Sequence, residues 1–395
     1  MSIMPDALSV ILTELMGRLV ERKGFQHAVM EVVSGDGSIA WSGATGAADP
    51  EGHPMRADTP FFVASIDKLL MATCILRLSE KRRLDMDAPI ADYLPRSVVV
   101  GVHRLGGVDH SWDLTLRHLL SHTSGLPDWL IDRPKKGPTL LDRLTSGQDI
   151  AISLEEIAEY VRSRLKPHFP PQPPDAKRRR ARYSDTNFML INALIESVTG
   201  LPAGRVYEQM LFAPLGMRST WVFGHTDPMD RTPSPAVFYD GHRPISIPLM
   251  IKSIRGVYST TCDMIRFLRA LIGSRVFANP DTLEMMRGHW TRFGFPLDRA
   301  ALRQPSWPIA YGLGMMRFHD PLLSLIGRLP RGLRPLYPVP AVIGHTGATG
   351  TWLFYCPLLD VYLSGSVDDV RAGPVPFRLM YPLLRALEQA GLPRE

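Results

Sequence analysis

The chain has 395 residues, of which 45% are hydrophobic and 21% are charged, a composition typical of a globular protein with a large core. Its length is enough for two or three domains. The net charge of +6 is too small for a dedicated nucleic-acid-binding protein. The three cysteines, Cys74, Cys262 and Cys356, are far apart and follow neither a zinc-binding nor a disulfide pattern, which fits a reducing compartment.

Residues 1–24 predict an amphipathic helix, because Leu8, Leu12, Leu15 and Leu19 recur at helical spacing. Acidic and basic residues interrupt the apolar ones, so the stretch has the pattern of neither a signal peptide nor a membrane span. We therefore expect a cytoplasmic protein with no integral membrane segment.

Two strands are predicted next, within residues 27–45, joined by a turn at Gly35-Asp36-Gly37. The segment FFVASIDKLLMATCILRLSE, at 61–80, follows. It begins with apolar residues and continues as a helix pattern that starts near Ser65.

The middle of the chain predicts further helices. A short one ends at Gly125, and another covers 153–165, with Ser153 and Glu156 as a capping box. A third follows and ends at Gly200. This part of the chain is therefore expected to be mainly helical.

Strands return near the end of the chain. The apolar stretches AVIGHTG, TWLFYC and VYLSGSV predict three of them, and a helix is expected at about 378–390. Strands thus cluster at both ends of the sequence, with helices between them.

Two segments allow more than one interpretation. The basic run KRRRAR, at 177–182, is typical of a solvated loop, although it also has the composition of a nucleic-acid or anion contact. Residues 319–342 mix leucines with arginines. They predict either a loop packed on the core or an apolar flap over one side of a substrate cleft.

A Ser-x-x-Lys pair occurs twice, as Ser65 with Lys68 and as Ser163 with Lys166. A nucleophilic serine needs a base for its proton and donors for the oxyanion that forms. Ser65 lies at the start of its helix pattern, where backbone N–H groups are free, and Lys68 returns to the same face one turn later. Ser163 lies at the carbonyl end of a helix, so we interpret the second pair as structural.

Two further stretches complete an ordered set of motifs: RYSDTNF, which contains Tyr183, and VIGHTGATGTW, which contains His345-Thr346-Gly347. With Ser65 and Lys68, this order resembles the penicillin-recognising serine hydrolases. That family includes class C β-lactamases, D-alanyl-D-alanine carboxypeptidases and family VIII esterases. The segments LRHLLSHTSGLPDW, SIRGVYSTTCDMIRFLRALI and YGLGM resemble the same branch, and no Ser-Asp-Asn motif of the class A enzymes occurs.

The resemblance implies an α+β fold, in which residues 1–80 and 218–395 build an antiparallel sheet flanked by helices. Residues 81–217 are then a mainly helical domain, and the site lies in the cleft between the two parts. The family roles carry over as follows: Ser65 as acylated nucleophile, Lys68 and Tyr183 for proton transfer, the N–H groups of Ser65 and Ala348 as oxyanion hole, and Asp185, His345, Thr346 and Gly347 at the substrate.

Two residues depart from the family pattern. Asp185 stands where class C β-lactamases usually have Asn, and a carboxylate cannot donate an N–H to a lactam side chain. We expect it to pair with Lys68 and keep it charged, which shifts the work of the base toward Tyr183. His345 stands where many relatives have Lys, and is expected to bond Tyr183 or a substrate carboxylate. Both departures weaken the case for an anionic β-lactam substrate.

The function that we predict is a carboxylesterase for small or medium acyl esters, with a small-molecule ester or amide as its partner. No metal, cofactor or nucleic acid is expected. The alternatives are a β-lactamase or D-alanyl-D-alanine carboxypeptidase, an acyltransferase of a biosynthetic pathway, and a non-catalytic binding protein of the same fold. His122 is predicted to be a structural turn residue rather than a base, and Trp129 and Trp352 line either the cleft or the core.

Overall fold

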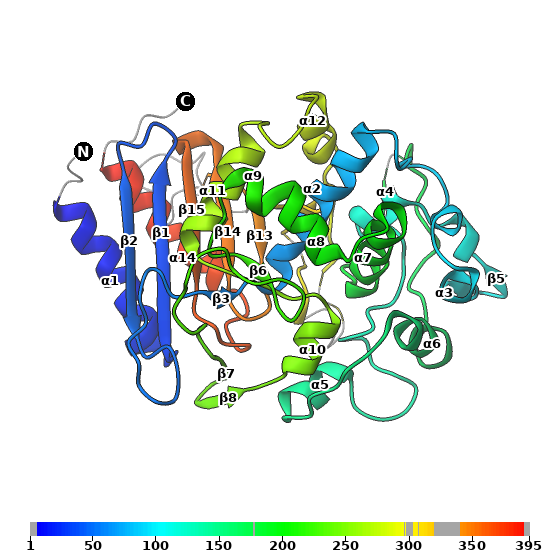
Figure 1. Cartoon of the computed structure of the whole chain (residues 1–395), viewed down its shortest axis with the longest axis horizontal. Helices are drawn as coiled ribbons and strands as arrows, with labels where there is room; N and C mark the ends of the chain where they lie inside the picture. The colour runs from blue at the N-terminus through cyan, green and yellow to red at the C-terminus, as the bar shows by residue number, and fades with distance from the viewer. Residues whose placement is uncertain are drawn as a thin grey trace.

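The computed structural model describes residues 6–176, 178–295, 297, 303–306, 308–319 and 340–390 (Figure 1). Its central feature is an eight-stranded sheet in the order β10-β11-β12-β13-β14-β15-β1-β2, in which every neighbouring pair is antiparallel. The strands are β1 (His27–Ser34), β2 (Ala40–Gly46), β10 (Thr291–Arg292), β11 (Ala310–Tyr311), β12 (Met316–Phe318), β13 (Val342–Thr346), β14 (Trp352–Cys356) and β15 (Val361–Ser366). Because β1 pairs with β15, the two ends of the chain form one sheet.

Helices cover both faces of this sheet. Helices α1 (Asp6–Lys23) and α14 (Val375–Gln389) pack on one face, and α11 (Thr261–Ile272) packs on the other (Figure 1). Side chains alternate along β14 accordingly. Trp352 and Phe354 join the core beneath α1 and α14, whereas Leu353 and Tyr355 join the core that contains α11.

The part of the chain that separates β2 from β10 is mainly helical, and most of it lies on the right in Figure 1. Its helices are α2 (Asp67–Glu80), α3 (Arg96–Val99), α4 (Leu116–Leu120), α5 (Leu140–Thr145), α6 (Leu154–Arg164), α7 (Asp185–Thr199), α8 (Ala203–Tyr207) and α9 (Ala213–Leu215), followed along the chain by α10 (Pro248–Ser253) and α12 (Asp281–Arg287). Helices α2 and α7 pack against each other, and α4 packs on α7. The turn before α2 and α2 itself also contact β13, which brings the start of α2 to this strand.

Three small sheets complete the fold. They are β3 (Phe61–Phe62) with β9 (Val257–Ser259) and β6 (Trp221–Val222), then β4 (Arg104–Leu105) with β5 (Val108–Asp109), and β7 (Phe238–Asp240) with β8 (Arg243–Ile245). The first of these sheets leads directly into the turn that carries Ser65.

The structure confirms the predicted α+β fold with its antiparallel sheet and flanking helices. The predicted capping box of α6 is present, with Ser153 N–H 2.7 Å from the Glu156 carboxylate and Glu156 N–H 3.2 Å from Ser153 Oγ. Gly200 ends α7 in a left-handed conformation, with φ of +71°. The division at residues 80/81 and 217/218 stays a prediction.

Two helix bounds differ from the sequence prediction. Helix α4 ends at Leu120 rather than near Gly125, because His122 takes φ of +55°, which no α-helix contains. Helix α14 begins at Val375, three residues before the predicted start, because Pro376 fits the first turn of a helix. Most of the 319–342 segment lies outside the described residues, so its two interpretations stay open. Among the described helices, none is both long enough and apolar enough to cross a membrane.

Candidate active site

Ser65 lies in a strained turn at the start of a helix. The preceding residue, Ala64, has φ of +48°, and residues Ala64–Ile66 form a single 3-10 turn that runs into α2. A positive φ is costly for a residue with a Cβ atom and is often found at functional sites. The turn presents Ser65, which is half-buried, at the N-terminal end of α2.

Lys68 lies one turn further on and joins Ser65 to Asp185. Its Nζ donates to Ser65 Oγ at 2.9 Å and lies 2.7 Å from Asp185 Oδ1. Burial alone would lower the pKa of Lys68, but the Asp185 carboxylate and other nearby anionic groups raise it well above its ordinary value. Lys68 is therefore an ammonium, and the expected ion pair with Asp185 is present.

Tyr183 precedes α7 and is buried beside these groups. Lys68 Nζ lies 5.4 Å from the centre of its ring. Burial raises the pKa of Tyr183 strongly, although the Lys68 charge and hydrogen bonding to Ser65 and Lys68 oppose this rise. At neutral pH the side chain is a protonated phenol within reach of the predicted nucleophile.

His345 lies on β13 and is fully buried. Its Nδ1 is 2.8 Å from the Thr346 carbonyl, which only accepts, so Nδ1 carries the proton. Its Nε2 is 2.9 Å from the Tyr311 hydroxyl and accepts from it. Burial and the nearby Lys68 charge lower the pKa of His345 to about 3, so the ring is neutral. Of the two partners expected for His345, Tyr183 or a substrate carboxylate, Tyr183 is not hydrogen-bonded to it here: Tyr311 occupies Nε2, and the ring centres of Tyr183 and His345 lie 6.5 Å apart.

The end of β13 is held against the Ser65 turn by Gly347. A Cβ atom at Gly347 would lie 2.7 Å from Ala64 Cβ and 2.8 Å from the Val63 carbonyl, so only glycine allows this approach. Thr351 Oγ1 donates to the same Val63 carbonyl at 3.0 Å. Within the described residues, no hydrogen bond engages the backbone N–H of Ser65 or of Ala348. These two groups therefore remain free to form the predicted oxyanion hole.

An aromatic cluster that the sequence did not predict surrounds Tyr183, and it includes His122, which was expected to be a structural turn residue. The ring of His122 lies 4.4 Å from that of Tyr183 and 4.6 Å from that of Tyr311, and Phe293 lies 5.6 Å from Tyr311, measured between ring centres. Both His122 and Tyr311 belong to segments that carried the family resemblance. These segments therefore indicated that His122 and Tyr311 belong to the family pattern, but not which groups the two residues contact.

Other residues singled out from the sequence take structural places. Trp129 and Trp352 are fully buried and belong to the core. Ser163 Oγ donates to the Glu159 carbonyl at 2.8 Å, which satisfies it within its own helix. The basic run is not uniformly solvated, because Arg182 pairs with Asp132 at 3.1 Å.

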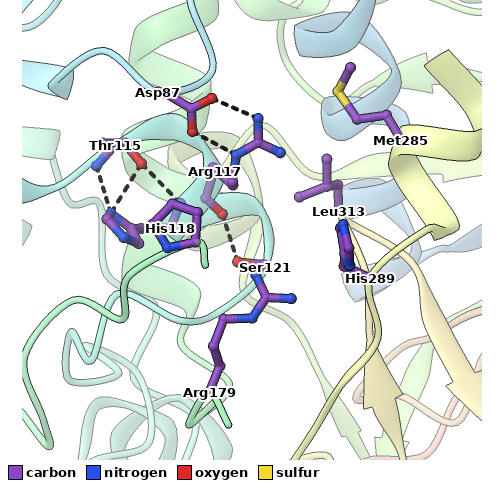
Figure 2. Close-up of a pocket in the computed structure, with 10 residues that line it drawn as sticks. Asp87, Thr115, Arg117, His118, Ser121, Arg179, Met285, His289 and Leu313 are labelled. Carbon is purple, nitrogen blue, oxygen red and sulfur yellow. Dashed lines mark hydrogen bonds and ion pairs between the residues drawn. The ribbon is translucent and has the colours of Figure 1, made fainter. Parts of the chain in front are cut away.

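A cavity of about 410 Å³ lies between the α4 region and α12 (Figure 2). Arg117 and Asp87 form a two-pronged ion pair in its wall, at 2.6 and 2.8 Å. Arg179 of the basic run and Leu313 also line it. None of the predicted catalytic side chains lines this cavity, so the candidate active site rests on the geometry around Ser65.

One group of side chains has the composition of a metal site. The ligand atoms of Asp49, Glu51 and His53 all lie within 4.8 Å of one another. Glu51 and His53 are exposed, and Asp49 already bonds His53 at 2.7 Å. Since exposed acidic groups of this kind are common without a metal, we assign them no role.

Comparisons with known proteins agree with the motif order. Esterase EstB of Burkholderia gladioli is 29% identical over 348 residues, which cover 78% of this chain and 82% of EstB. Penicillin-binding protein 4* of Bacillus subtilis is 26% identical over 276 residues, or 66% of this chain and 55% of that protein.

Solved structures show the same fold. The D-amino acid amidase of Ochrobactrum anthropi SV3, complexed with L-phenylalanine amide, aligns with a TM-score of 0.71 at 20% identity, over 97% of this chain and 99% of the amidase. A family model described as Beta-lactamase matches residues 13–365 of this chain. Because that match spans most of the sequence, the chain belongs to the Beta-lactamase family of serine hydrolases.

Proposed function

We propose that the protein is a carboxylesterase that forms an acyl-enzyme on Ser65 and acts on uncharged esters of small or medium acyl chains. The observation that carries this proposal is the state of His345. Its ring is buried, neutral and bonded on both nitrogens, so this position of β13 offers no cation to a substrate carboxylate. β-Lactams and D-alanyl peptides carry such a carboxylate, whereas simple esters do not.

The ion pair of Lys68 with Asp185 decides which group acts as the base. Lys68 is held as an ammonium, so it has no free electron pair to accept the Ser65 proton. Tyr183 takes this role once its phenol has lost its proton, and the neighbouring ammonium stabilises the phenolate that results. The reactive form is therefore a minor species at neutral pH that grows as the pH rises.

The reaction then follows from these positions. The Tyr183 phenolate takes the proton of Ser65 as Oγ attacks the ester carbonyl carbon. The N–H groups of Ser65 and Ala348 hold the oxyanion of the tetrahedral intermediate. Tyr183 returns its proton to the oxygen of the leaving alcohol when the carbon–oxygen bond breaks. Water repeats the sequence on the acyl-enzyme, with Tyr183 again as base.

This arrangement favours esters over amides. An amine must be protonated before it leaves, and a phenol with a strongly raised pKa is a weak acid for that purpose. Asp185 moreover accepts hydrogen bonds only, so it cannot donate to an amide carbonyl of the substrate. Transfer of the acyl group to an alcohol other than water uses the same acyl-enzyme and differs only in the acceptor.

A substrate panel tests the proposal. The rates of hydrolysis of p-nitrophenyl acetate, butyrate and octanoate are compared with those of nitrocefin and of a D-alanyl-D-alanine peptide. Ser65→Ala serves as the blank for each substrate. We expect kcat/KM for the best ester to exceed that for nitrocefin and for the peptide by at least about a hundredfold. Faster turnover of nitrocefin or of the peptide would assign the protein to one of the alternative functions, and no turnover of any substrate would favour a binding protein.

A further inference from the structure

Helix α7 is capped by a separate loop of the chain. Its N-cap residue, Ser184, makes no capping bond with its own side chain. Instead the Ser184 N–H donates to His122 Nδ1 at 3.1 Å, and the Asp185 N–H donates to Asp128 Oδ2 at 3.1 Å. The first N–H groups of a helix have no partner within it, so these two bonds stabilise the helix start.

The His122 ring is fixed as a neutral acceptor. Asn187 presents its amide nitrogen to His122 Nδ1 at 3.0 Å, because its oxygen already accepts from Ser124 Oγ at 2.7 Å. Two N–H donors therefore meet at Nδ1, and the ring proton resides on Nε2. Burial, together with the charge of Lys68, holds the pKa of His122 well below its ordinary value, so the ring stays neutral.

His122 also bonds the backbone N–H of the residue on each side of Tyr183. Its carbonyl accepts the Arg182 N–H at 3.0 Å, while its ring accepts the Ser184 N–H. The ring itself packs on the Tyr183 ring, with centres 4.4 Å apart and planes inclined by 33°. The backbone before Tyr183, the backbone after it and the face of its ring are thus all in contact with one residue.

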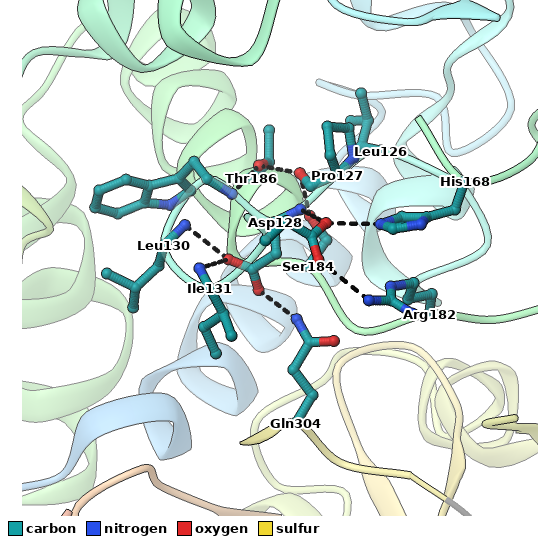
Figure 3. Close-up of polar contacts among 12 residues, drawn as sticks. Leu126, Pro127, Asp128, Leu130, Ile131, His168, Arg182, Ser184, Thr186 and Gln304 are labelled. Carbon is teal, nitrogen blue, oxygen red and sulfur yellow. Dashed lines mark hydrogen bonds and ion pairs between the residues drawn. The ribbon is translucent and has the colours of Figure 1, made fainter. Parts of the chain in front are cut away.

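Asp128 anchors the other half of the helix start, and Figure 3 shows its bonds to Leu130, Ile131 and Gln304. Its Oδ1 accepts the N–H groups of Leu130 and Ile131 at 2.8 and 3.2 Å. Its Oδ2 accepts from Asp185 and from the Gln304 amide, at 3.1 and 2.9 Å. Burial and the nearby carboxyl groups of Asp185 and Asp132 raise the pKa of Asp128, while the N–H groups of Leu130 and Asp185 oppose this rise. Four N–H donors around this buried carboxyl group leave it a single orientation, so Asp128 is a rigid anchor for Asp185.

We propose that His122 and Asp128 are positioning residues of the reaction: His122 holds the Tyr183 hydroxyl at Ser65, and Asp128 holds the Asp185 carboxylate at Lys68. This inference rests on the proposed roles of Tyr183 and Asp185. Both side chains are fully buried, and their hydrogen bonds go to the start of α7 and its neighbours rather than to Ser65, so we expect them to act through the residues that they hold.

Three variants separate this role from general stability. His122→Asn keeps an acceptor near the place of Nδ1 and tolerates a positive φ, whereas His122→Gly tolerates the same φ without any acceptor. His118→Asn is the matched control. His118 is also buried, and its Nδ1 also accepts a backbone N–H, from Thr115 at 3.1 Å, but it caps α4. All three are measured with a p-nitrophenyl ester, and each rate is divided by the number of Ser65 sites that a fluorophosphonate labels.

We expect His122→Gly to lose about a hundredfold or more in kcat per labelled site, with KM changed less than about threefold. His122→Asn should retain kcat within about tenfold, and His118→Asn should match the wild type. Equal losses in His122→Asn and His122→Gly overturn the role of the acceptor, and so does wild-type kcat in His122→Gly.

Asp128→Asn tests the role of Asp128 independently, and this test remains even if His122→Gly does not fold. This substitution replaces one carboxyl oxygen of residue 128 by an NH2 group, which cannot accept the N–H groups that face it. The Asp185 carboxylate should then lose its fixed place at Lys68. We expect the ascending limb of the pH profile of kcat/KM to move to lower pH, and an unmoved limb overturns this role. If wild-type Ser65 is not labelled at all, the proposed function fails instead, and the two failures are thereby distinguished.

Discussion

At the scale of single residues, Asp185 sets the charge of the site. Its carboxylate raises the pKa of Lys68 and also raises that of Tyr183, so it keeps both protons in place at neutral pH. A class C β-lactamase-like amide at this position would do neither. Under the proposed mechanism, the carboxylate in place of an amide therefore delays the release of the base to higher pH.

The variant Asp185→Asn tests this effect through pH. Removal of the negative charge lowers the pKa of Lys68 and of Tyr183, so the deprotonated, reactive form appears at lower pH. We expect the ascending limb of kcat/KM against pH to move down by about one unit or more for an ester substrate. The ratio of nitrocefin to ester turnover should rise in the same variant. A limb that stays in place, or moves up, would show that Asp185 does not control the proton state of the base.

Which residues could be predicted at this scale depended on their sequence neighbours. Ser65, Lys68 and Asp185 lie within short motifs, and the Lys68–Asp185 ion pair follows from their chemistry. Tyr311 and His122 also lie within segments that resemble the family, but no catalytic role was predicted for either. Their contacts with Tyr183 and His345 join positions that are far apart in the chain, and no local pattern encodes such contacts.

At the scale of elements, the site depends on the closeness of β13 and the Ser65 turn. Gly347 allows this contact because any side chain there would meet Ala64 and Val63. Gly314 plays a similar part against α2 itself, where its φ of +73° and the nearness of Ala72 exclude a Cβ atom. Two glycines thus bring separate strands onto the first turns of the helix that bears Lys68.

Gly347→Ala should separate these elements. Its Cβ would lie 2.1 Å from Thr351 Oγ1, 2.7 Å from Ala64 Cβ and 2.8 Å from the Val63 carbonyl oxygen. The last two atoms cannot rotate away, so the strand must shift away from Ser65. We expect kcat/KM to fall by at least about tenfold, since a misplacement of about 1 Å can cost about a hundredfold. Gly17→Ala is the control, because nothing lies within 4 Å of that position in α1, and its activity should be unchanged. Wild-type activity in Gly347→Ala would show that the closeness is not needed.

Element positions were largely predictable, and their ends less so. The hairpin of β1 and β2, the strands β13 to β15 and helices α6 and α7 follow from apolar periodicity and capping residues. The end of α4 did not, because the left-handed conformation of His122 is imposed by its contacts with α7 rather than by its own sequence preference.

At the scale of the whole molecule, contacts between the two ends of the chain hold the sheet together. His27 Nε2 on β1 and Asp368 Oδ2 after β15 lie 2.9 Å apart, and both side chains are fully buried. The other ring nitrogen of His27 donates to the Ala47 carbonyl at 2.8 Å. Burial lowers the pKa of His27, but the hydrogen bond and charge of Asp368 outweigh this effect and raise it overall.

Asp368→Asn tests this closure. A His with a raised pKa in the folded state contributes stability that is complete below its unfolded pKa and is lost as the pH rises through the folded pKa. We expect the variant to lose about 3 kcal/mol of unfolding free energy at pH 6 and less at pH 9, measured by urea unfolding. Asp49→Asn, which alters the His53 pair at the surface, should change stability little. Equal losses at both pH values would argue against a charged His27.

If Ser65 is the acylated nucleophile, a covalent serine probe must label it. The protein is incubated with a fluorophosphonate, digested and analysed by mass spectrometry, in parallel with Ser65→Ala and Ser163→Ala. We expect one label per chain on the peptide that contains Ser65, in the wild type and in Ser163→Ala, and no label and no ester turnover in Ser65→Ala. Label on a different residue, or ester turnover that survives in Ser65→Ala, would contradict the account.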